Sequence, residues 1–313
     1  MDDYPKTPAE FDVLFSSEEA CREYLIRLRW PDGIVCPRCC GTKVWPTKRD
    51  LLVCASCGHQ ISVTAGTILQ DTRKPLSLWF RAMWYITGQK TGTSALGLQR
   101  VLGLASYRTA WTWLHKLRRA MVRPGRDRLS GTVEVDETYV GAPKTGKRGR
   151  GAAGKSLVLI AAEIDGKKIG RIRLVRVSDA SGDSLGTAIR ESIHPGSIIQ
   201  TDGWTGYRPL DSMGYRHHVV RATAELGDNL LPHCHRVASL LKRWMLGTHQ
   251  GGISHEHLEY YLDEFTFRFN RRTSHHRGKL FHRLVQQAVA VKPQPYKTLV
   301  RHARGRQPKK HNL

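Results

Sequence analysis

Cysteine spacing constrains the fold of this chain more than any other feature. The sequence contains two Cys-x-x-Cys pairs with 14 residues between them: Cys36, Cys39, Cys54 and Cys57. Each pair can place two thiolates on one ion, and four thiolates form the tetrahedral set that Zn²⁺ takes in structural sites. We therefore predict a zinc ribbon over residues 31–70 that needs its metal to fold. Cys40 could compete with Cys39 as a ligand.

Charge restricts the partners of the chain. The 313 residues include 50 Lys and Arg against 27 Asp and Glu, and the resulting formal net charge of +23 favours a polyanionic partner. The sequence has no apolar run near the ~20 residues that span a bilayer. Its first residues also lack the apolar core of a signal peptide. We expect a protein of the reduced cytoplasm without a membrane partner.

Two stretches near the N-terminus have helical periodicity. Residues 8–30 are predicted as a helical lead-in that buries Cys21. Residues 74–125 are predicted as three helices in a helix-turn-helix arrangement, with Ser94 and Ser106 as N-caps. The third of these helices carries side chains that could contact DNA: Arg108, His115, Lys116, Arg118 and Arg119. A helical connector with a solvated charged face is the alternative.

Strands and helices alternate from Gly131 onward. Three strands, a helix and a short buried strand are predicted in this order: 131–141, 155–165, 167–177, 183–193 and 197–202. The second strand is apolar almost throughout and is therefore central. By analogy, this order indicates an RNase-H-like α/β core. We predict that catalytic domain over residues 130–290, after the zinc ribbon and the helical segment.

Two aspartates in these strands suit a two-metal site. Asp136 lies within the first strand, and Asp202 ends the last one, before Gly203. In phosphoryl transfer, two ions about 4 Å apart activate the attacking oxygen and stabilise the leaving one, so carboxylates must converge from different elements. Successive strand side chains alternate between faces, so we expect Glu137 to point away from Asp136 and to have a supporting role. Taken alone, Asp202 would be interpreted as an ordinary turn residue.

Three segments resemble the ISXO-type transposases, DDE enzymes of bacterial insertion sequences with a zinc ribbon, related to Merlin-type elements. They are VEVDETYVG, IIQTDGWTGY and SLLKRWMLGTHQGGISHEHLEYYLDEFTFRFNRR, and the similarity covers residues 15–290. The resemblance implies strand cleavage and joining with two Mg²⁺ or Mn²⁺ ions, with Asp136 and Asp202 at the first two acidic positions. It also implies double-stranded DNA partners (terminal repeats and target), a homodimer or larger synaptic assembly, and a place at the bacterial nucleoid.

The third acidic position departs from the family pattern. Where the family has Glu or Asn seven residues before a Lys, this chain has His235 before Lys242, in a helix bounded by Pro232 and Gly247. The pair shares one helix face about 10 Å apart, which suits a metal ligand and a phosphate contact. Imidazole suits Mn²⁺ better than the hard Mg²⁺. His233 is expected to be solvated or to touch DNA. Three acids are alternatives to His235: Glu225, Asp228 and Glu256.

Further basic residues are candidates for DNA contact. Three lie in the Gly-rich loop 144–155, and the others lie in the two helical segments that follow: Lys147, Arg148, Arg150, Arg243, Arg271 and Arg272. A solvated hairpin tip is the alternative for the loop, and a helix C-terminal dipole is an alternative partner for the last two arginines. Phe267 and Phe269 are expected to pack inward. Residues 291–313 are expected to form a disordered cationic tail.

These patterns together favour a DNA transposase. Asp136, Asp202 and His235 would hold the catalytic ions, and Lys242 would position phosphate. A catalytically decayed transposase that acts as a zinc-ribbon DNA-binding protein is the first alternative, because the third ligand is unusual. An RNase-H-like nuclease that acts on RNA or branched DNA is the second. It would use the same carboxylates without preferring one terminal repeat.

Overall fold

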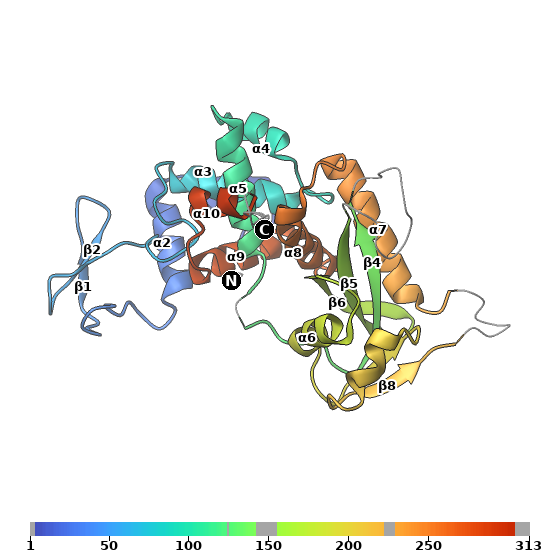
Figure 1. Cartoon of the computed structure of the whole chain (residues 1–313). Helices are drawn as coiled ribbons and strands as arrows, with labels where there is room; N and C mark the ends of the chain where they lie inside the picture. The colour runs from blue at the N-terminus through green and yellow to red at the C-terminus, as the bar shows by residue number, and fades with distance from the viewer. Residues whose placement is uncertain (1–3, 124, 142–154, 222–228, 304–313) are drawn as a thin grey trace, which may run out of the picture. The chain divides into compact units, whose positions relative to one another are not determined.

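The chain divides into two compact units. The computed structural model describes residues 4–123, 125–141, 155–221 and 229–303 (Figure 1). One unit comprises Met1–Pro124 and Thr273–Arg301, and the other is built on Gly125–Arg272. Within the described residues, no helix is both long and apolar enough to cross a membrane.

The cysteine-rich segment of the first unit is a small antiparallel sheet. Its strands are β1 (Val44–Pro46), β2 (Leu52–Cys54) and β3 (Gln60–Ile61), with β2 in the middle. Arg29 ties the chain that leaves β3 to the preceding helix, because its guanidinium group donates to the carbonyls of Ser62 and Val63 at 3.0 and 2.6 Å. The sheet is therefore held by backbone pairing, by this arginine and by the cysteine cluster described below.

Helices make up the rest of the first unit. They are α1 (Pro8–Leu14), α2 (Glu18–Arg29), α3 (Leu76–Gly88), α4 (Ala95–Leu102), α5 (Tyr107–Ala120), α9 (Arg277–Ala290) and α10 (Tyr296–Ala303). Ser17 and Ser94 cap α2 and α4 by accepting a backbone N–H three residues ahead, at 3.1 and 3.0 Å. Ser106 precedes α5 without such a bond. Cys21 is fully buried in α2, which confirms its predicted role in the core.

Helix α9 completes the core of the first unit. Phe281 of α9 is fully buried, and its ring lies 5.4 to 5.7 Å from those of Phe11, Phe15 and Phe80. The sequence assigned this helix to the catalytic domain and residues 291–313 to a disordered tail. Instead, residues 273–301 join the N-terminal unit, and α10 forms with Leu299 buried. The reason is an apolar face whose aromatic partners lie 201 to 270 residues earlier in the sequence.

The second unit contains a mixed sheet of five strands in the order β6-β5-β4-β7-β8. The strands are β4 (Thr132–Val140), β5 (Ser156–Asp165), β6 (Lys168–Val177), β7 (Ile198–Thr201) and β8 (Arg216–Val219). The first three pair antiparallel, and β7 pairs parallel with β4 and β8. This α/β arrangement is consistent with the predicted RNase-H-like core. Strand β8 was not predicted, because its largely exposed residues lack an apolar alternation.

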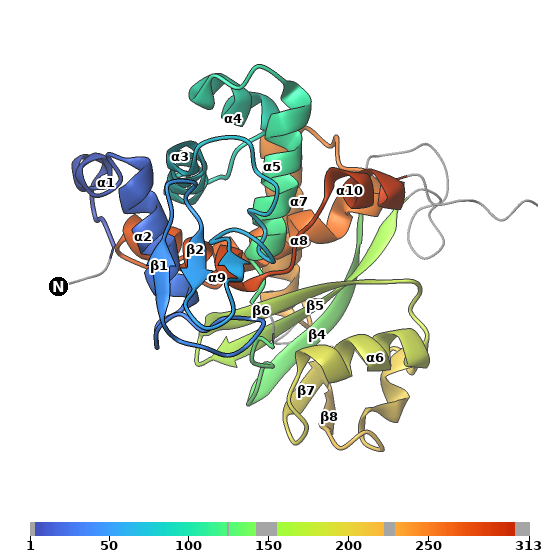
Figure 2. The same ribbon diagram turned by 90° about the vertical axis from the view of Figure 1, so that its left-hand side faces the viewer.

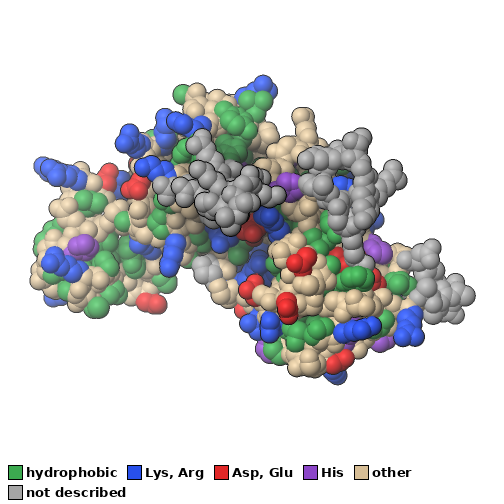
Figure 3. All heavy atoms as spheres, viewed as in Figure 1, with side chains coloured by type: hydrophobic (Ala, Val, Ile, Leu, Met, Phe, Trp, Pro, Cys, Tyr) green, Lys and Arg blue, Asp and Glu red, His purple; other side chains and the backbone are tan. Residues whose placement is uncertain are grey.

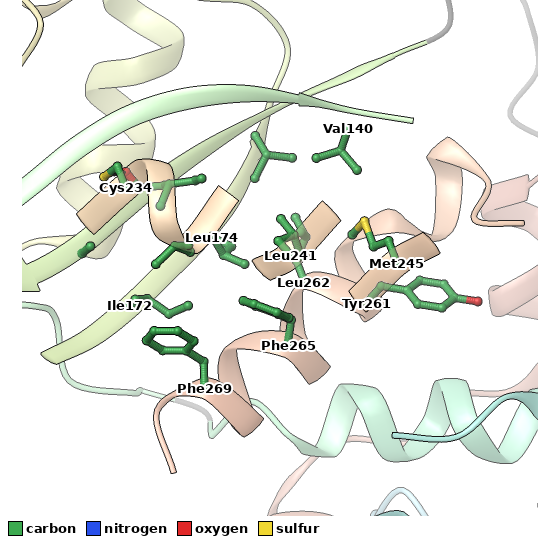
Figure 4. Close-up of a cluster of buried hydrophobic side chains, with 14 of the residues drawn as sticks. Val140, Ile172, Leu174, Cys234, Leu241, Met245, Tyr261, Leu262, Phe265 and Phe269 are labelled. Carbon is green, nitrogen blue, oxygen red and sulfur yellow. Dashed lines mark hydrogen bonds between the residues drawn. The ribbon is translucent and has the colours of Figure 1, made fainter. Parts of the chain in front are cut away.

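Helices cover both faces of this sheet (Figure 2). One face packs on α6 (Gly182–Ser192) and the 3₁₀ helix η1 (Thr205–Leu210), with Val133 and Val135 of β4 in that cluster. The other packs on α7 (Pro232–His249) and α8 (Leu258–Phe269), where Val140 of β4 belongs to the cluster drawn in Figure 4. Odd-numbered residues of β4 therefore face α6, and even-numbered residues face α7.

Helix α7 begins at Pro232, as predicted, but it runs past Gly247 to His249. Gln250 ends it in the left-handed conformation, with φ of 48°. Glycine is common at the left-handed position after a helix but is not required there. Gly247, which was predicted to end α7, is instead part of its last turn. Met245, in the last part of this longer helix, is a buried member of the core.

Candidate active site and zinc site

The four paired cysteines converge on one point. Their sulfur atoms all lie within 4.8 Å of one another: Cys36, Cys39, Cys54 and Cys57. The Sγ atoms of Cys36 and Cys57 are 3.7 Å apart, and those of Cys39 and Cys54 are 3.5 Å apart. A tetrahedron with Zn–S bonds of about 2.3 Å has edges of about 3.8 Å, so this cluster fits a structural zinc ion. Cys40 is exposed at φ of 59° and is not part of the cluster, which leaves Cys39 as the ligand.

Backbone amides lower the pKa of one thiol of this cluster. The backbone N–H of Cys57 is the main cause that lowers the pKa of the Cys54 thiol to about 6, in spite of burial, which raises it. A thiolate at neutral pH is the form that binds zinc. Four thiolates would leave no coordination position open on a bound ion, which is the pattern of a structural zinc site.

Asp136 and Asp202 lie at the same level of neighbouring strands. Thr132 pairs with Ile198 in the parallel β4–β7 ladder, and the same offset of 66 residues relates Asp136 to Asp202, immediately after β7. Asp202 is exposed and accepts a hydrogen bond from the backbone N–H of Trp204 at 3.0 Å, across a turn whose central residue is Gly203 at φ of 81°. Adjacent strands thus bring the two carboxylates together, although they are 66 residues apart in sequence.

The carboxyl group of Asp136 is poised to bind a cation. Its pKa is raised to about 6, mainly by burial and to a smaller extent by the charges of Glu137 and Asp202. The backbone N–H of Glu137, which donates to Asp136 Oδ1 at 2.8 Å, and the imidazole of His235 act in the opposite direction. Burial and nearby like charge disfavour an isolated carboxylate, and a bound divalent cation would relieve both effects.

His235 presents one ring nitrogen to Asp136. Its Nε2 atom lies 3.5 Å from Asp136 Oδ2, and its Nδ1 lies 2.6 Å from Asn229 Oδ1. An amide oxygen only accepts, so Nδ1 donates to Asn229, and Nε2 is the ring nitrogen that is left to face Asp136. Histidines that bind metals are usually oriented in this way. Asn229 lies outside the helix, and the sequence did not mark it as part of the site.

A buried glutamate fixes the start of α7 on β4. Glu134 is 3% exposed, and its carboxylate accepts from the backbone N–H groups of His233 and Cys234 at 2.8 and 2.9 Å. The Nδ1 atom of His233 lies 2.5 Å from the same carboxylate, so the expectation that His233 is solvated or touches DNA was wrong. A carboxylate suits the positive end of a helix. Glu134 and Asp136 share one face of β4, and this spacing of two was the signal that the sequence reasoning missed.

Glu137 faces the opposite side of the sheet, as alternation predicted. Its Oε2 accepts from the hydroxyl of Tyr207 at 2.5 Å, and Tyr207 is fully buried in the cluster beneath α6. Burial and the charge of Glu137 raise the pKa of Tyr207, so the phenol remains a donor. This hydrogen bond fixes β4 on the face of the sheet opposite to Asp136.

The three candidate ligands of the catalytic site lie further apart than the four cysteines do. Among the described parts of the chain, the four cysteines are the only group of three or more His, Cys, Asp or Glu ligand atoms within 4.8 Å of one another. Asp136, Asp202 and His235 are therefore not centred on one point. Ions 3.5–4 Å apart spread their ligands more widely, and carboxylate with imidazole suits a metal such as Mn²⁺. Glu225 and Asp228 lie outside the described residues, and Glu256 lies beyond α7.

Lys242 is exposed on the outer face of α7. Burial of its ammonium group, followed by the charge of Lys155, lowers its pKa, and Asp136 raises it. Arg243 beside it is also exposed. The influence of Asp136 on Lys242 indicates that this part of α7 lies near the middle of β4.

The predicted DNA-contact residues differ in exposure. Arg108 and Arg119 of α5 are exposed, but Lys116 is half-buried, Arg118 is only 2% exposed and His115 is fully buried. Because α5 packs against both α4 and α9, its exposed face is narrower than the sequence suggested, and we remove Arg118 and His115 from the candidates. Lys and Arg side chains are scattered over the face of the molecule in Figure 3. Three predicted contacts lie outside the described residues: Lys147, Arg148 and Arg150.

Arg271 and Arg272 stabilise the end of α8. Their guanidinium groups lie 4.2 Å from the ring centres of the buried Phe267 and Phe269, respectively, and each donates to the carbonyl of the same phenylalanine. Arg272 also donates to carbonyls at the start of β6. The predicted inward packing of the two phenylalanines is confirmed. The arginines bind the carbonyl end of the helix, the alternative given above, rather than pointing free toward DNA.

Replacing Asp136 by Asn is expected to stabilise the protein against unfolding when the catalytic divalent ions are absent. The experiment therefore supplies only one equivalent of zinc, enough for the cysteine cluster. The folded-state pKa of about 6 lies above the ordinary 3.8, so ionisation above pH 6 opposes folding. The side chain is 19% exposed, and the neutral amide should gain up to about 3 kcal/mol at pH 8. This advantage should shrink as the pH falls toward 5. Urea unfolding at both pH values measures it, with Asp165→Asn at an exposed turn as the control. A gap independent of pH would contradict the prediction.

Comparison with known proteins identifies two domains. The family model described as ISXO2-like transposase domain matches residues 128–270, and the one described as transposase zinc-ribbon domain matches residues 16–60. A relative from Halobacterium salinarum, described as an uncharacterized protein in transposable element ISH50, is 28% identical over 277 residues. The alignment covers 81% of this chain and 91% of the relative. That organism is an archaeon, so this match does not support the bacterial origin that the resemblance implied.

Proposed function

Because this chain belongs to the ISXO2-like transposases with an N-terminal zinc ribbon, we propose that it cleaves and joins DNA strands at the ends of an insertion sequence. Its DNA partners are the terminal repeats of the element and the target, and two ends must be joined, so the working form is a dimer or larger assembly. The net charge of +23 supports a polyanionic substrate.

One observation carries this proposal. His235 Nε2 lies 3.5 Å from Asp136 Oδ2, and Asp202 follows the neighbouring strand at the matching level. Three potential ligands, carried by two neighbouring inner strands and a helix, thus lie near one another. Divalent ions at these ligands would activate the attacking oxygen and stabilise the leaving oxygen of a phosphodiester.

The side chains divide the remaining work. Asp136 and His235 would hold one side of the metal site, with Asn229 fixing the ring of His235 and Glu134 fixing the helix that carries it. Lys242, exposed on the same helix, would bind a DNA phosphate. Water would attack first, in line, and the freed 3′-hydroxyl would then attack the target DNA. No covalent enzyme–DNA bond is needed.

The unusual third ligand gives a direct test of this assignment. We expect the wild type to nick a labelled duplex carrying the element's terminal repeat more efficiently with Mn²⁺ than with Mg²⁺, because imidazole is a poor ligand for Mg²⁺. His235→Glu should shift the ratio of Mg²⁺ to Mn²⁺ rates toward Mg²⁺ by about tenfold or more, and His235→Ala should weaken both reactions. Asn229→Ala, which removes only the orienting contact, should have a smaller effect in the same direction as His235→Ala.

The same assay separates the alternative functions. A decayed transposase that acts as a DNA-binding protein would bind the repeat with normal affinity and would cleave with neither metal. The histidine at the third position is the observation that favours this alternative. A nuclease for RNA or branched DNA would cleave without preferring the repeat. Equal Mg²⁺ to Mn²⁺ ratios for the wild type and His235→Glu would remove His235 from the metal site.

A further inference from the structure

A cavity of about 250 Å³ opens beside the candidate active site, in the second unit. It lies between the end of β4, the second half of α7 and the turn that leads to α8. Its apolar wall and its two cationic side chains are Val140, Met245, Leu246, Ile253 and Leu258, with Lys155 and Lys242. The cavity is therefore apolar on one side and positively charged on the other, and Lys242 is its one lining residue to which the function proposed above gives a role.

The apolar wall is an open end of the hydrophobic core. Val140, Met245 and Leu258 are buried members of the cluster between the sheet and α7–α8, and Ile253 packs against it. In Figure 4, Val140 and Met245 lie at one end of this cluster and Phe269 at the other. Leu246, by contrast, is 60% exposed. An exposed leucine beside a cavity with an apolar wall forms a surface to which an apolar or planar group can bind.

Two lysines line this cavity together, and the charge of Asp136 acts on one of them, Lys242. The nearness of Lys155, after the effect of burial, lowers the pKa of Lys242, so the two ammonium groups repel each other. In the described residues, neither lysine forms an ion pair with a carboxylate within 4 Å. Two like charges at one cavity mouth are best accommodated by an anion between them, and a phosphate group meets that requirement.

The polar rim of the cavity is hydrogen-bonded to the sheet. His255 lines it, its Nδ1 lies 2.7 Å from the hydroxyl of Ser156, and its carbonyl accepts from Arg176 at 3.0 Å. Ser156 is itself 6% exposed. The turn before α8 is thus attached to β5 and β6, which makes the cavity a preformed site rather than a loose gap between loops.

The position of the cavity relates it to the scissile phosphate. Tyr139, at its edge, follows Asp136 by three residues, about 10 Å along β4. Lys242 follows His235 by seven residues, about 10 Å along α7. The cavity therefore lies within a few nucleotides of a phosphate bound at Asp136 and His235, since stacked nucleotides rise about 3.4 Å each.

We propose that this cavity holds one nucleotide of the DNA substrate rotated out of its helix, with the base against Leu246 and Ile253 and its phosphate between Lys155 and Lys242. The proposal rests on the transposase function and specifies how the substrate is held there. A base inside a duplex offers its edges only, so an apolar wall can meet a base face only after unstacking. Base binding of this kind tolerates sequence variation, since every base has a flat face.

Fluorescence of 2-aminopurine tests this directly. The base is placed in turn at each position flanking the cleavage site of the terminal-repeat duplex, and Ca²⁺ replaces the catalytic ion. We expect a severalfold rise in fluorescence at one position, because unstacking relieves quenching. Leu246→Glu should abolish the rise and weaken binding of that duplex about tenfold or more. Val13→Glu makes the same charge change at a residue of α1 that is 76% exposed, and it should leave the rise intact.

The outcomes separate this inference from the proposed function. Cleavage by the wild type without a fluorescence rise at any position overturns the inference alone, as does an equal rise in Leu246→Glu. Saturable binding of free 2-aminopurine deoxynucleoside monophosphate, with no response in the duplex, would assign the cavity to soluble nucleotides and would also overturn it. Absence of both repeat binding and cleavage overturns the inference together with the transposase function.

Discussion

Replacing Asp136 by Asn is expected to reduce metal-dependent cleavage of the terminal-repeat duplex by at least about a thousandfold. Metal ions at such a site contribute several kcal/mol to stabilising the charged transition state, and each 1.36 kcal/mol corresponds to about a factor of ten in rate. Asp136 combines burial with contact to His235 and closeness to Asp202, so no other carboxylate of the described site can take its place. Single-turnover cleavage in Mn²⁺ measures the loss.

Glu137→Gln is the matched control for this experiment. It changes the adjacent residue in the same way, but the side chain lies on the other face and binds Tyr207. We expect a decrease of less than about tenfold, since an amide oxygen can still accept the tyrosine hydrogen bond. Repeat binding should be retained by both variants. Equal loss of cleavage in the two variants would mean that Asp136 has no special role in metal binding.

Loss of zinc is expected to unfold the ribbon. Structural zinc binding contributes about 10–16 kcal/mol to the folding of small zinc modules, which this three-stranded sheet cannot replace with its short strands. Cys39→Ser should lower the zinc content well below one ion per chain and should expose residues 31–70 to protease. Affinity for the terminal repeat should fall with it if the ribbon takes part in binding. Zinc analysis and limited proteolysis measure the first two effects.

Cys40→Ser distinguishes the ligand from its neighbour. Cys40 is exposed in a left-handed turn, whereas Cys39 Sγ lies 3.5 Å from Cys54 Sγ. We expect Cys40→Ser to retain one zinc per chain and the protease resistance of the wild type. If it lost zinc as Cys39→Ser does, the assignment of the first Cys-x-x-Cys pair would be wrong.

Local patterns were sufficient for much of the fold. Cysteine spacing predicted the zinc ribbon, and apolar alternation predicted β4 to β7 to within one or two residues of their observed ends. The opposite orientation of Asp136 and Glu137 followed from the pleat alone. These features depend on spacing along the chain, so they can be predicted without knowing which distant segments pack against them.

Other features depend on partners far away in sequence. Glu134 looks like an ordinary strand acid until α7 places its first two free N–H groups on it. The burial of Arg118 depends on packing around α5, and the place of α9 depends on the aromatic core formed by residues 11–84. Strand β8 lacks a pattern of its own and exists because β7 offers a free edge.

The sequence by itself determined the zinc ligands, the strand that carries Asp136 and the faces of that strand, because spacing and alternation are local geometric properties. Only the tertiary structure decided that His235 meets Asp136, that Asn229 orients it and that two lysines share one apolar cavity. The physical reason is that each of these contacts joins separate segments, and their distances are set by how the helix at 232–249 lies on the sheet.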